Sequence, residues 1–527
     1  MPSLDATTKK TIAIVATVFL FVWGLSLFAQ KIDLTTADLG RHIKNGELIL
    51  NGSVEERRAV FTENFYSYTE PTHPFLNHHW GSGVLFYLIE RVAGFGGLSL
   101  FFLLGIALSL FFSFDLARRG SNIFIALSLS LFFLPIMAVR SEIRPEVFTY
   151  LFSIFFAWLL FRYERGEVPS RALWLLPIVG FFWVNLHIGF IFGIFIIGIF
   201  LFSRMVKDRH LLSSGAKRLW IFLCATSFVT LINPAGLAGV LYPFRIFTAY
   251  GYRVLENQSV RFIEGLSLTT GYDILLFKAS AVLVGFLVLL FLMRGKGRFP
   301  LPFFLFSAVF GVLAASQVRQ FPLFALFALP TVALLIMGFR VAKQEAGKSA
   351  YHVPASLTVL LFALCVLGLV RGERLLEGRS ANFGIGLAPG NALSGEFIKA
   401  VGISGPIFNN YDIGSYLVYV FAPQTKVFVD NRPEAYPPDF FDVRYIPPQE
   451  DGAKFDGLDR EIHFNAIIFN YRDATPWAQA FLMRMLADRR FAPVFADARV
   501  IIFVRRDEGN KALIQQYEIA QDRFSSH

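Results

Sequence analysis

Residues 11–29 read TIAIVATVFLFVWGLSLFA, a run of nineteen residues that is almost wholly apolar. A helix of this length crosses the hydrocarbon core of a bilayer, which is roughly 30 Å thick. The run follows Lys9 and Lys10, is too long for the apolar core of a signal peptide, and has no good small-x-small cleavage site. We therefore expect it to be a retained membrane span.

Similar apolar runs divide most of the chain. Of its 527 residues 55% are hydrophobic and 17% are charged, whereas soluble domains carry about a quarter charged residues. The sequence predicts a mainly α membrane protein with about eleven transmembrane helices and a C-terminal soluble α/β domain. The predicted spans are 11–29, 96–116, 121–139, 146–161, 172–186, 188–203, 218–232, 273–293, 299–315, 320–339 and 353–370.

The net charge of +10 lies largely in short loops between these spans, for example at Arg118 and Arg119 and at Arg204, Lys207 and Arg209. This distribution is the positive-inside bias of a multi-span protein, and it argues against nucleic acid as a partner. We expect a cytoplasmic N-terminus. The long loops 30–95 and 233–272, and everything after residue 371, then face outward.

The chain changes character after the last span. Residues 1–371 form the predicted membrane domain, and residues 380–527 form a predicted outward domain in which short β-rich runs alternate with helical patterns. Such alternation favours a mostly parallel sheet with helices on its faces, with its last two strands in an antiparallel hairpin. The predicted strands are GPIFNN, TKVFVD, NAIIFN, APVFAD and RVIIFVRR, and the predicted helices are NALSGEFIKAVG, DIGSYLVYVF, PWAQAFLMRMLADRR and GNKALIQQYEIAQ.

The unusual polar residues fall on the predicted outward side, several of them within a turn of a span end. Ionisable groups there are costly and usually face a cavity or a partner. Because they come from several loops on one side of the membrane, we predict that they converge on one site. The candidates are Asp38, His42, His78, His79, Arg140, Arg144, Asn185, His187, Glu264 and Arg319.

Asp38 and His42 open this set in the stretch TTADLGRHIKNGELI, which begins at Thr35. Their spacing of four places both side chains on one face of a helical turn. A carboxylate at this position could accept a proton from a hydroxyl nucleophile or hold a divalent cation, and the sequence leaves both open. The structural alternative is an acidic residue that favours the N-terminal dipole of a short helix.

His78 and His79 stand beside Trp80, just before the second span. An interfacial anchor explains the tryptophan but not the two histidines. Neighbours in a helix do not face the same way, so a single metal bound by both is disfavoured. We expect these histidines to orient substrate.

Arg140, Arg144 and Arg319 depart from the positive-inside rule, because they lie on the predicted outer side. The guanidinium fork matches phosphate geometry, which favours a phosphate-bearing ligand at the outer membrane face. Pairing with Glu142 or Glu146 is the alternative for any one of them.

Asn185 and His187 lie between two spans with barely a turn between them, in WVNLHIGF. They fit either a substrate contact or a polar tip that turns the chain. Glu264 lies in the long loop 233–272, which opens with an Asn-Pro turn signal. The residues around Glu264 do not by themselves indicate a chemical role for it.

Two motifs in the tail place polar residues just after predicted strands. They are FNNYDIG, with Asn409, Asn410 and Asp412, and FVDNRPEAY, with Asp430, Asn431 and Arg432. Open α/β sheets bind ligands at the carboxyl ends of strands, but for these residues loop capping and turn formation are the favoured interpretation. No GxGxxG follows a strand, so a dinucleotide is disfavoured.

Taken in order, these motifs resemble the GT-C superfamily of integral-membrane glycosyltransferases, which includes protein mannosyltransferases, aminoarabinose transferases and oligosaccharyltransferases. The segments that carry the resemblance are DLGRHIKNGELI, FYSYTEPTHPFLNHHW, RPEVFTYLF, WVNLHIGF, INPAGL and NNYDIGSYL…KVFVDNRPEAY, over residues 33 to 440. The sequence departs from the family where an aromatic pair usually follows the first-loop Asp, since Leu39, Gly40 and Arg41 stand there. The acidic pair common in such loops is also absent, because Ala37 and Leu39 flank Asp38.

The resemblance implies a hexosyltransferase-type enzyme that moves a sugar from a polyprenyl-phosphate donor to a glycan, lipid or protein acceptor on the outer side of a bacterial inner membrane. It places Asp38 at the first-loop acidic position and suggests that Arg144 and Arg319 neutralise the lipid phosphate. Two alternatives stay open. A lipid or solute transporter would place ionisable groups near the bilayer midplane, and a non-enzymatic scaffold would use the tail to recruit a partner.

Overall fold

The computed structural model describes residues 6–246, 250–266, 271–294, 298–345 and 355–524. Parts of the predicted loop 233–272 and the start of the predicted span 353–370 lie outside these ranges. The chain forms two compact units. We call Met1–Gln30, Ser99–Gly236 and Arg253–Gly384 the helical unit, and Lys31–Leu98, Leu237–Tyr252 and Ile385–His527 the mixed unit. The division into functional domains at residues 371 and 380 stays a prediction.

Each apolar run predicted as a span forms a helix over most of the residues that the structure describes. The helices are α1 (Ala6–Ser26), α4 (Trp80–Gly120), α5 (Ile123–Met137), α6 (Glu146–Glu164), α7 (Leu175–Leu186), α8 (Ile191–Asp208), α9 (Ser214–Val229), α12 (Tyr272–Arg294), α13 (Leu301–Ser316), α14 (Phe321–Glu345) and α15 (Ala355–Gly378). Within the described residues, six helical segments are long and apolar enough to cross a membrane, and shorter apolar helices accompany them. The predicted fold class, a mainly α membrane protein with a C-terminal α/β part, is confirmed.

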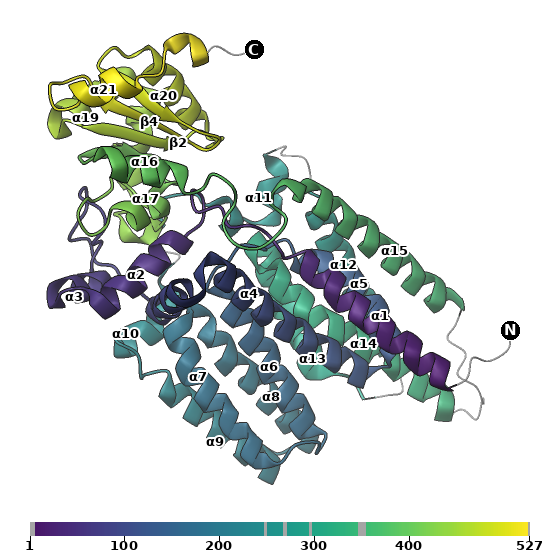
Figure 1. Cartoon of the computed structure of the whole chain (residues 1–527). Coiled ribbons are helices and arrows are strands. Elements are labelled where there is room, and N and C mark those ends of the chain that lie inside the picture. The colour runs from purple at the N-terminus through teal and green to yellow at the C-terminus, as the bar shows by residue number, and fades with distance from the viewer. Residues whose placement is uncertain (1–5, 247–249, 267–270, 295–297, 346–354, 525–527) are drawn as a thin grey trace. The chain divides into compact units, whose positions relative to one another are not determined.

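The helical unit consists of two packed groups of helices (Figure 1). One group contains α6, α7, α8 and α9, and the other contains α1, α5, α12, α13, α14 and α15. Helix α14 packs on α6, and α13 packs on α8, so the two groups share an interface. A buried hydrogen bond of 2.8 Å from Ser307 to Thr331 links α13 to α14.

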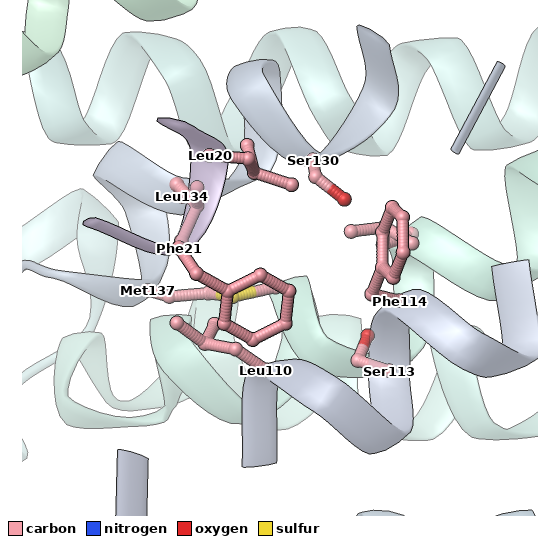
Figure 2. Close-up of a pocket in the computed structure, with 9 residues that line it drawn as sticks. Leu20, Phe21, Leu110, Ser113, Phe114, Ser130, Leu134 and Met137 are labelled. Atoms are coloured by element: carbon pink, nitrogen blue, oxygen red, sulfur yellow. The ribbon is translucent and has the colours of Figure 1, made fainter. Parts of the chain in front are cut away.

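A small apolar pocket lies between α1, α4, α5 and α14 (Figure 2). Leu20, Phe21, Leu110 and Phe114 are among its lining residues, and the only polar side chains in the lining are those of Ser113 and Ser130. No titratable group lines this pocket, so it offers no acid–base chemistry.

The mixed unit contains a four-stranded sheet in the order β1-β2-β4-β3. Strand β1 (Ile407–Asn409) is parallel to β2 (Ala466–Asn470), whereas β4 (Val500–Arg505) is antiparallel to both β2 and β3 (Phe491–Ala496). The predicted hairpin is therefore confirmed, but the prediction of a mostly parallel sheet is wrong. The accompanying helices are α16 (Leu393–Val401), α17 (Gly414–Phe421), α18 (Ile446–Glu450), α19 (Gly452–Ile462), α20 (Pro476–Ala487) and α21 (Lys511–Tyr517).

The segment TKVFVD is not a strand of this sheet, which corrects the prediction. The Asn409 side chain accepts a hydrogen bond from the Phe428 N–H (3.0 Å) and donates one to the Val429 carbonyl (2.8 Å). On the other side, Val427 exchanges backbone hydrogen bonds with Tyr66 and Tyr68 of the first loop. The Asn409 side chain and the first loop thus satisfy the backbone groups of TKVFVD that a neighbouring strand would otherwise satisfy.

The first loop belongs to the same unit as the tail. It forms α2 (Leu39–Asn51) and α3 (Val54–Thr62), and α2 packs against α17. Helix α2 buries Leu39, Ile43 and Leu48, and farther along the loop Phe75 joins the aromatic core built around β1 and β2. Helix α3 begins at a capping box, in which Ser53 and Glu56 satisfy each other's backbone N–H groups.

Candidate functional site

Asp38 lies at the N-cap position of α2. Its carbonyl accepts the hydrogen bond from the N–H of His42, so the predicted helical turn between the two residues is formed. The half-buried Asp38 side chain makes no capping hydrogen bond to the helix. The Asp38 carboxylate therefore does not cap the helix in the way usual for an acidic N-cap residue.

Two glycines allow close approaches at the beginning of α2: Gly40 lets α17 approach α2, and Gly414 lets the two tail motifs approach each other. A Cβ on Gly40 would lie 2.9 Å from the Ser415 carbonyl oxygen, and one on Gly414 would lie 2.5 Å from the Cα of Asp430. The Asn431 side chain joins the pieces, because it accepts from the Ser415 N–H (2.7 Å) and donates to the Asp412 carbonyl (3.1 Å). The beginning of α2 and both tail motifs thus form one close-packed corner.

Asp412 brings a second carboxyl group to this corner. Burial raises its pKa to about 7, and the negative charges of Asp473 and Asp38 add to the effect. Asp473 itself is buried and accepts a hydrogen bond of 2.9 Å from Asn410. Asp38 and Asp412 therefore act on each other electrostatically, although they are far apart in the sequence.

Three imidazole rings form a chain that begins at His42. The His42 ring centroid lies 5.3 Å from that of His79, and the His79 centroid lies 3.8 Å from that of His78. Tyr242 continues the row, 5.0 Å from His78. The structure thus brings together the predicted residues His42, His78 and His79 and places Asp38 one helical turn before His42, all in the mixed unit.

Among the described residues, no group of three or more His, Cys, Asp or Glu side chains is arranged to hold a metal ion. The donor set around Asp38 does not fit a protein-held divalent cation, so we derive no step through one.

The remaining predicted residues belong to the helical unit, where the three outward arginines gather. Arg144 binds Glu142 at 2.8 Å and Glu256 at 3.1 Å. Arg319 binds Glu146 at 2.5 Å and the Asn257 side chain at 2.8 Å, and Arg140 is paired with Glu256. Convergence of this cluster with the residues around Asp38 stays a prediction.

Glu256 is the centre of the arginine cluster, and sequence reasoning missed it. Burial alone would raise its pKa, but Arg144, Arg140 and Arg319 outweigh that effect and lower the pKa to about 2. Glu256 is therefore an anion at neutral pH. Its position in the long loop after INPAGL gave no local signal, because its partners lie in two other segments of the chain, the turn before α6 and the turn before α14.

His187 and Asn185 have clear structural roles at the junction of α7 and α8. The His187 Nδ1 accepts from the Gly189 N–H (3.1 Å) and lies 2.6 Å from the Thr149 hydroxyl. Burial lowers the pKa of His187 to about 4, against the opposing charge of Glu146, so the ring is neutral at pH 7. Asn185 donates to the carbonyls of Phe181 and Ile232. These contacts favour the interpretation of a polar tip.

Glu264 forms an ion pair of 2.6 Å with Lys278, and both side chains are partly exposed. A pair of this kind contributes little stability and provides no specific chemistry. In the tail, Arg432 and Asp430 form a buried ion pair of 2.6 Å. Together with the hydrogen bonds of Asn409 and Asn431 described above, it supports capping and turn formation for most residues of the two tail motifs.

No protein-family model and no curated protein sequence matches the chain. Similar solved structures include the archaeal oligosaccharyltransferase AglB from Archaeoglobus fulgidus, in complex with an inhibitory peptide and a dolichol-phosphate. Its sequence identity is 12% and its TM-score 0.53, over 92% of this chain and 73% of AglB.

ArnT from Cupriavidus metallidurans is similar over 95% of this chain and 98% of its own, with 13% identity and a TM-score of 0.54 in the apo state. The structure of ArnT bound to undecaprenyl phosphate gives 14% identity and a TM-score of 0.50 over the same shares. AglB and ArnT are both GT-C superfamily membrane glycosyltransferases. The chain therefore has the GT-C fold, as its motifs predicted.

Proposed function

We propose that this protein is a membrane glycosyltransferase that moves a sugar from a polyprenyl-phosphate donor to an acceptor on the outer side of a bacterial inner membrane. The observation that carries the proposal is the position of Asp38 at the first turn of α2, one helical turn before His42, in a chain with the GT-C fold. That a similar fold binds undecaprenyl phosphate in ArnT, and a dolichol-phosphate in AglB, supports a lipid-linked donor.

In this mechanism Asp38 is the general base. It removes the proton from an acceptor hydroxyl as that oxygen attacks the anomeric carbon, and the bond from that carbon to the polyprenyl phosphate breaks with inversion. Negative charge develops on the departing phosphate, and an arginine side chain held in position at the site stabilises that charge. His42 and the neighbouring His79 and His78 orient the reactants.

The test is the release of polyprenyl phosphate by the purified protein from a panel of polyprenyl-phosphate sugars. If Asp38 is the base, Asp38→Asn should lower the rate by about 10²–10⁴-fold, because the proton must then pass to water. Glu55→Gln, which removes an exposed carboxylate of α3 in the same loop, is the matched control and should leave the rate unchanged.

Wild-type turnover by folded Asp38→Asn would reject Asp38 as the base. Absence of release from every donor, together with movement of labelled lipid across proteoliposomes without covalent change, would reject the transferase in favour of a transporter.

A further inference from the structure

Arg41 is a buried arginine of α2, in the segment after Asp38 where the family pattern usually has an aromatic pair. It is 5% exposed, and its Nε has no hydrogen-bond partner among the described residues. Other buried arginines of the mixed unit differ. Arg432 binds Asp430 and Asn64, and Arg499 binds Asp33 at 2.7 Å.

Arg41 and the carboxyl group of Glu434 interact only through space. Its charge acts on Glu434, whose pKa is raised chiefly by burial, with Arg41 and Arg432 opposing the rise. Within the described parts of the chain, Arg41 forms no ion pair with Glu434 or with any other carboxylate. Burying a charge without a bonded partner is costly, so a guanidinium held in this way is suited to receive an anion that the free protein lacks.

The position of Arg41 indicates that this anion would bind next to Asp38. It follows Asp38 by three residues on α2, and residues at this spacing are neighbours on a helix surface. The contrast with the helical unit is informative, because Arg140, Arg144 and Arg319 are all engaged by glutamates. Their charges are already compensated, whereas that of Arg41 is not.

We propose that Arg41 is an anion-binding residue of the Asp38 site, and that it holds a phosphate or similarly anionic oxygen group of a substrate. The proposal rests on the function proposed above, since it concerns the same site. A guanidinium presents a rigid fork of donors that matches such a group. The anion could be the phosphate of the lipid donor or a charged group of the acceptor.

The experiment measures binding rather than turnover, using the full chain in nanodiscs. The probes are a polyprenyl phosphate, the matching uncharged polyprenol, and inorganic phosphate. Arg41→Gln should weaken binding of the anionic probe by about 10- to 100-fold, the value of a hydrogen-bonded charge contact, and leave polyprenol binding unchanged. Arg58→Gln, at an exposed arginine of α3, is the matched control.

The two anionic probes separate the sources. Arg41-dependent binding of polyprenyl phosphate, but not of inorganic phosphate, assigns the donor lipid. Arg41-dependent binding of inorganic phosphate alone assigns a small anionic group of the acceptor. Equal affinities of wild type and Arg41→Gln for both probes, or no binding of either by the wild type, would overturn the proposal.

A purely structural role for Arg41 predicts a different pattern. Loss of a structural guanidinium should lower the thermal midpoint of the unliganded protein, whereas removal of a buried charge without a bonded partner should leave the midpoint unchanged or raise it. Arg41→Lys, which keeps the charge without the fork, should retain part of the binding. A lowered midpoint together with binding that lysine does not rescue would overturn the proposal.

Because no turnover is needed, this result stands apart from that of the proposed function. Arg41-dependent anion binding by a wild-type protein that transfers no sugar would keep the binding site and reject the transferase. Sugar transfer that is unaffected by Arg41→Gln would keep the transferase and reject Arg41 as the anion-binding residue.

Discussion

Asp412 holds its proton far more tightly in the folded protein than a free carboxyl group, since its pKa is raised from 3.8 to about 7 by burial and by Asp473 and Asp38. Between these two pH values the unfolded chain has lost the proton that the folded chain keeps. The folded state is therefore favoured at low pH, and this advantage falls as pH rises from about 4 to about 7. Above pH 7 the loss is complete.

Asp412→Asn removes this titration. The variant should show a flatter dependence of thermal midpoint on pH, and it should be more stable than wild type at pH 7 and above by a few degrees. Thermal unfolding in detergent between pH 4 and pH 8 checks this, with the exposed Asp439→Asn as control. Parallel pH profiles for wild type and Asp412→Asn would contradict the expected shift.

At the scale of elements, the candidate site depends on backbones that pass each other closely. A Cβ on Gly414 would lie 2.5 Å from the Val429 carbonyl oxygen, so Gly414→Ala must push α17 away from the segment after TKVFVD. We expect a loss of about 1–3 kcal/mol in the free energy of unfolding, typical of overpacking. The shift of α17 should also lower the rate of sugar transfer.

The matched control is Gly457→Ala inside α19, where the nearest atom to the new Cβ is the end of Arg460, 3.9 Å away. There the gain in helix propensity should leave stability unchanged or raise it by up to about 1 kcal/mol. Equal effects of the two substitutions, measured by chemical unfolding, would show that the close approach at Gly414 is not tight in solution.

At the scale of the whole molecule, the first loop and the tail form one unit although more than half of the chain separates them in sequence. Phe75 shares an aromatic core with Phe428 and Phe469, and Asp33 is paired with Arg499. Ending the chain after Gly384 should therefore expose the first loop as well as remove the tail. We expect rapid proteolysis within residues 31–98 and loss of sugar transfer.

Ending the chain after Asp507 is the milder comparison. It removes α21, which buries no residue, together with the ring contact of Tyr517 with Phe397 and the packing of Phe524 on the aromatic core. It should lower stability somewhat but leave the first loop covered. Limited proteolysis and the lipid-phosphate release assay measure both variants. A chain ending after Gly384 that retains a protease-resistant first loop and full transfer would favour the alternative in which the tail is a separate docking module.

Much of the fold was predictable because the relevant signals are local. A helix satisfies its own backbone hydrogen bonds, so an apolar run of sufficient length predicts a membrane helix without reference to any partner. The hairpin of β3 and β4 was predicted on the same ground, since its strands are neighbours in the chain. The prediction of a strand at TKVFVD was wrong, because the hydrogen bonds of this segment are made with the Asn409 side chain and with the distant first loop.

The candidate site divides in the same way. The sequence by itself determined the apolar helices, the charged turn at Asp38 and His42, and the outward arginines, because residue type and spacing define each of them. Only the tertiary structure decided that Glu256 pairs with Arg140 and Arg144, that Asp412 and Asp38 act on each other, and that Arg41 is buried without an ion pair within the described chain. Each of these depends on which charged side chains, distant in the sequence, lie close together in the fold. The spacing of residues along the chain does not determine that.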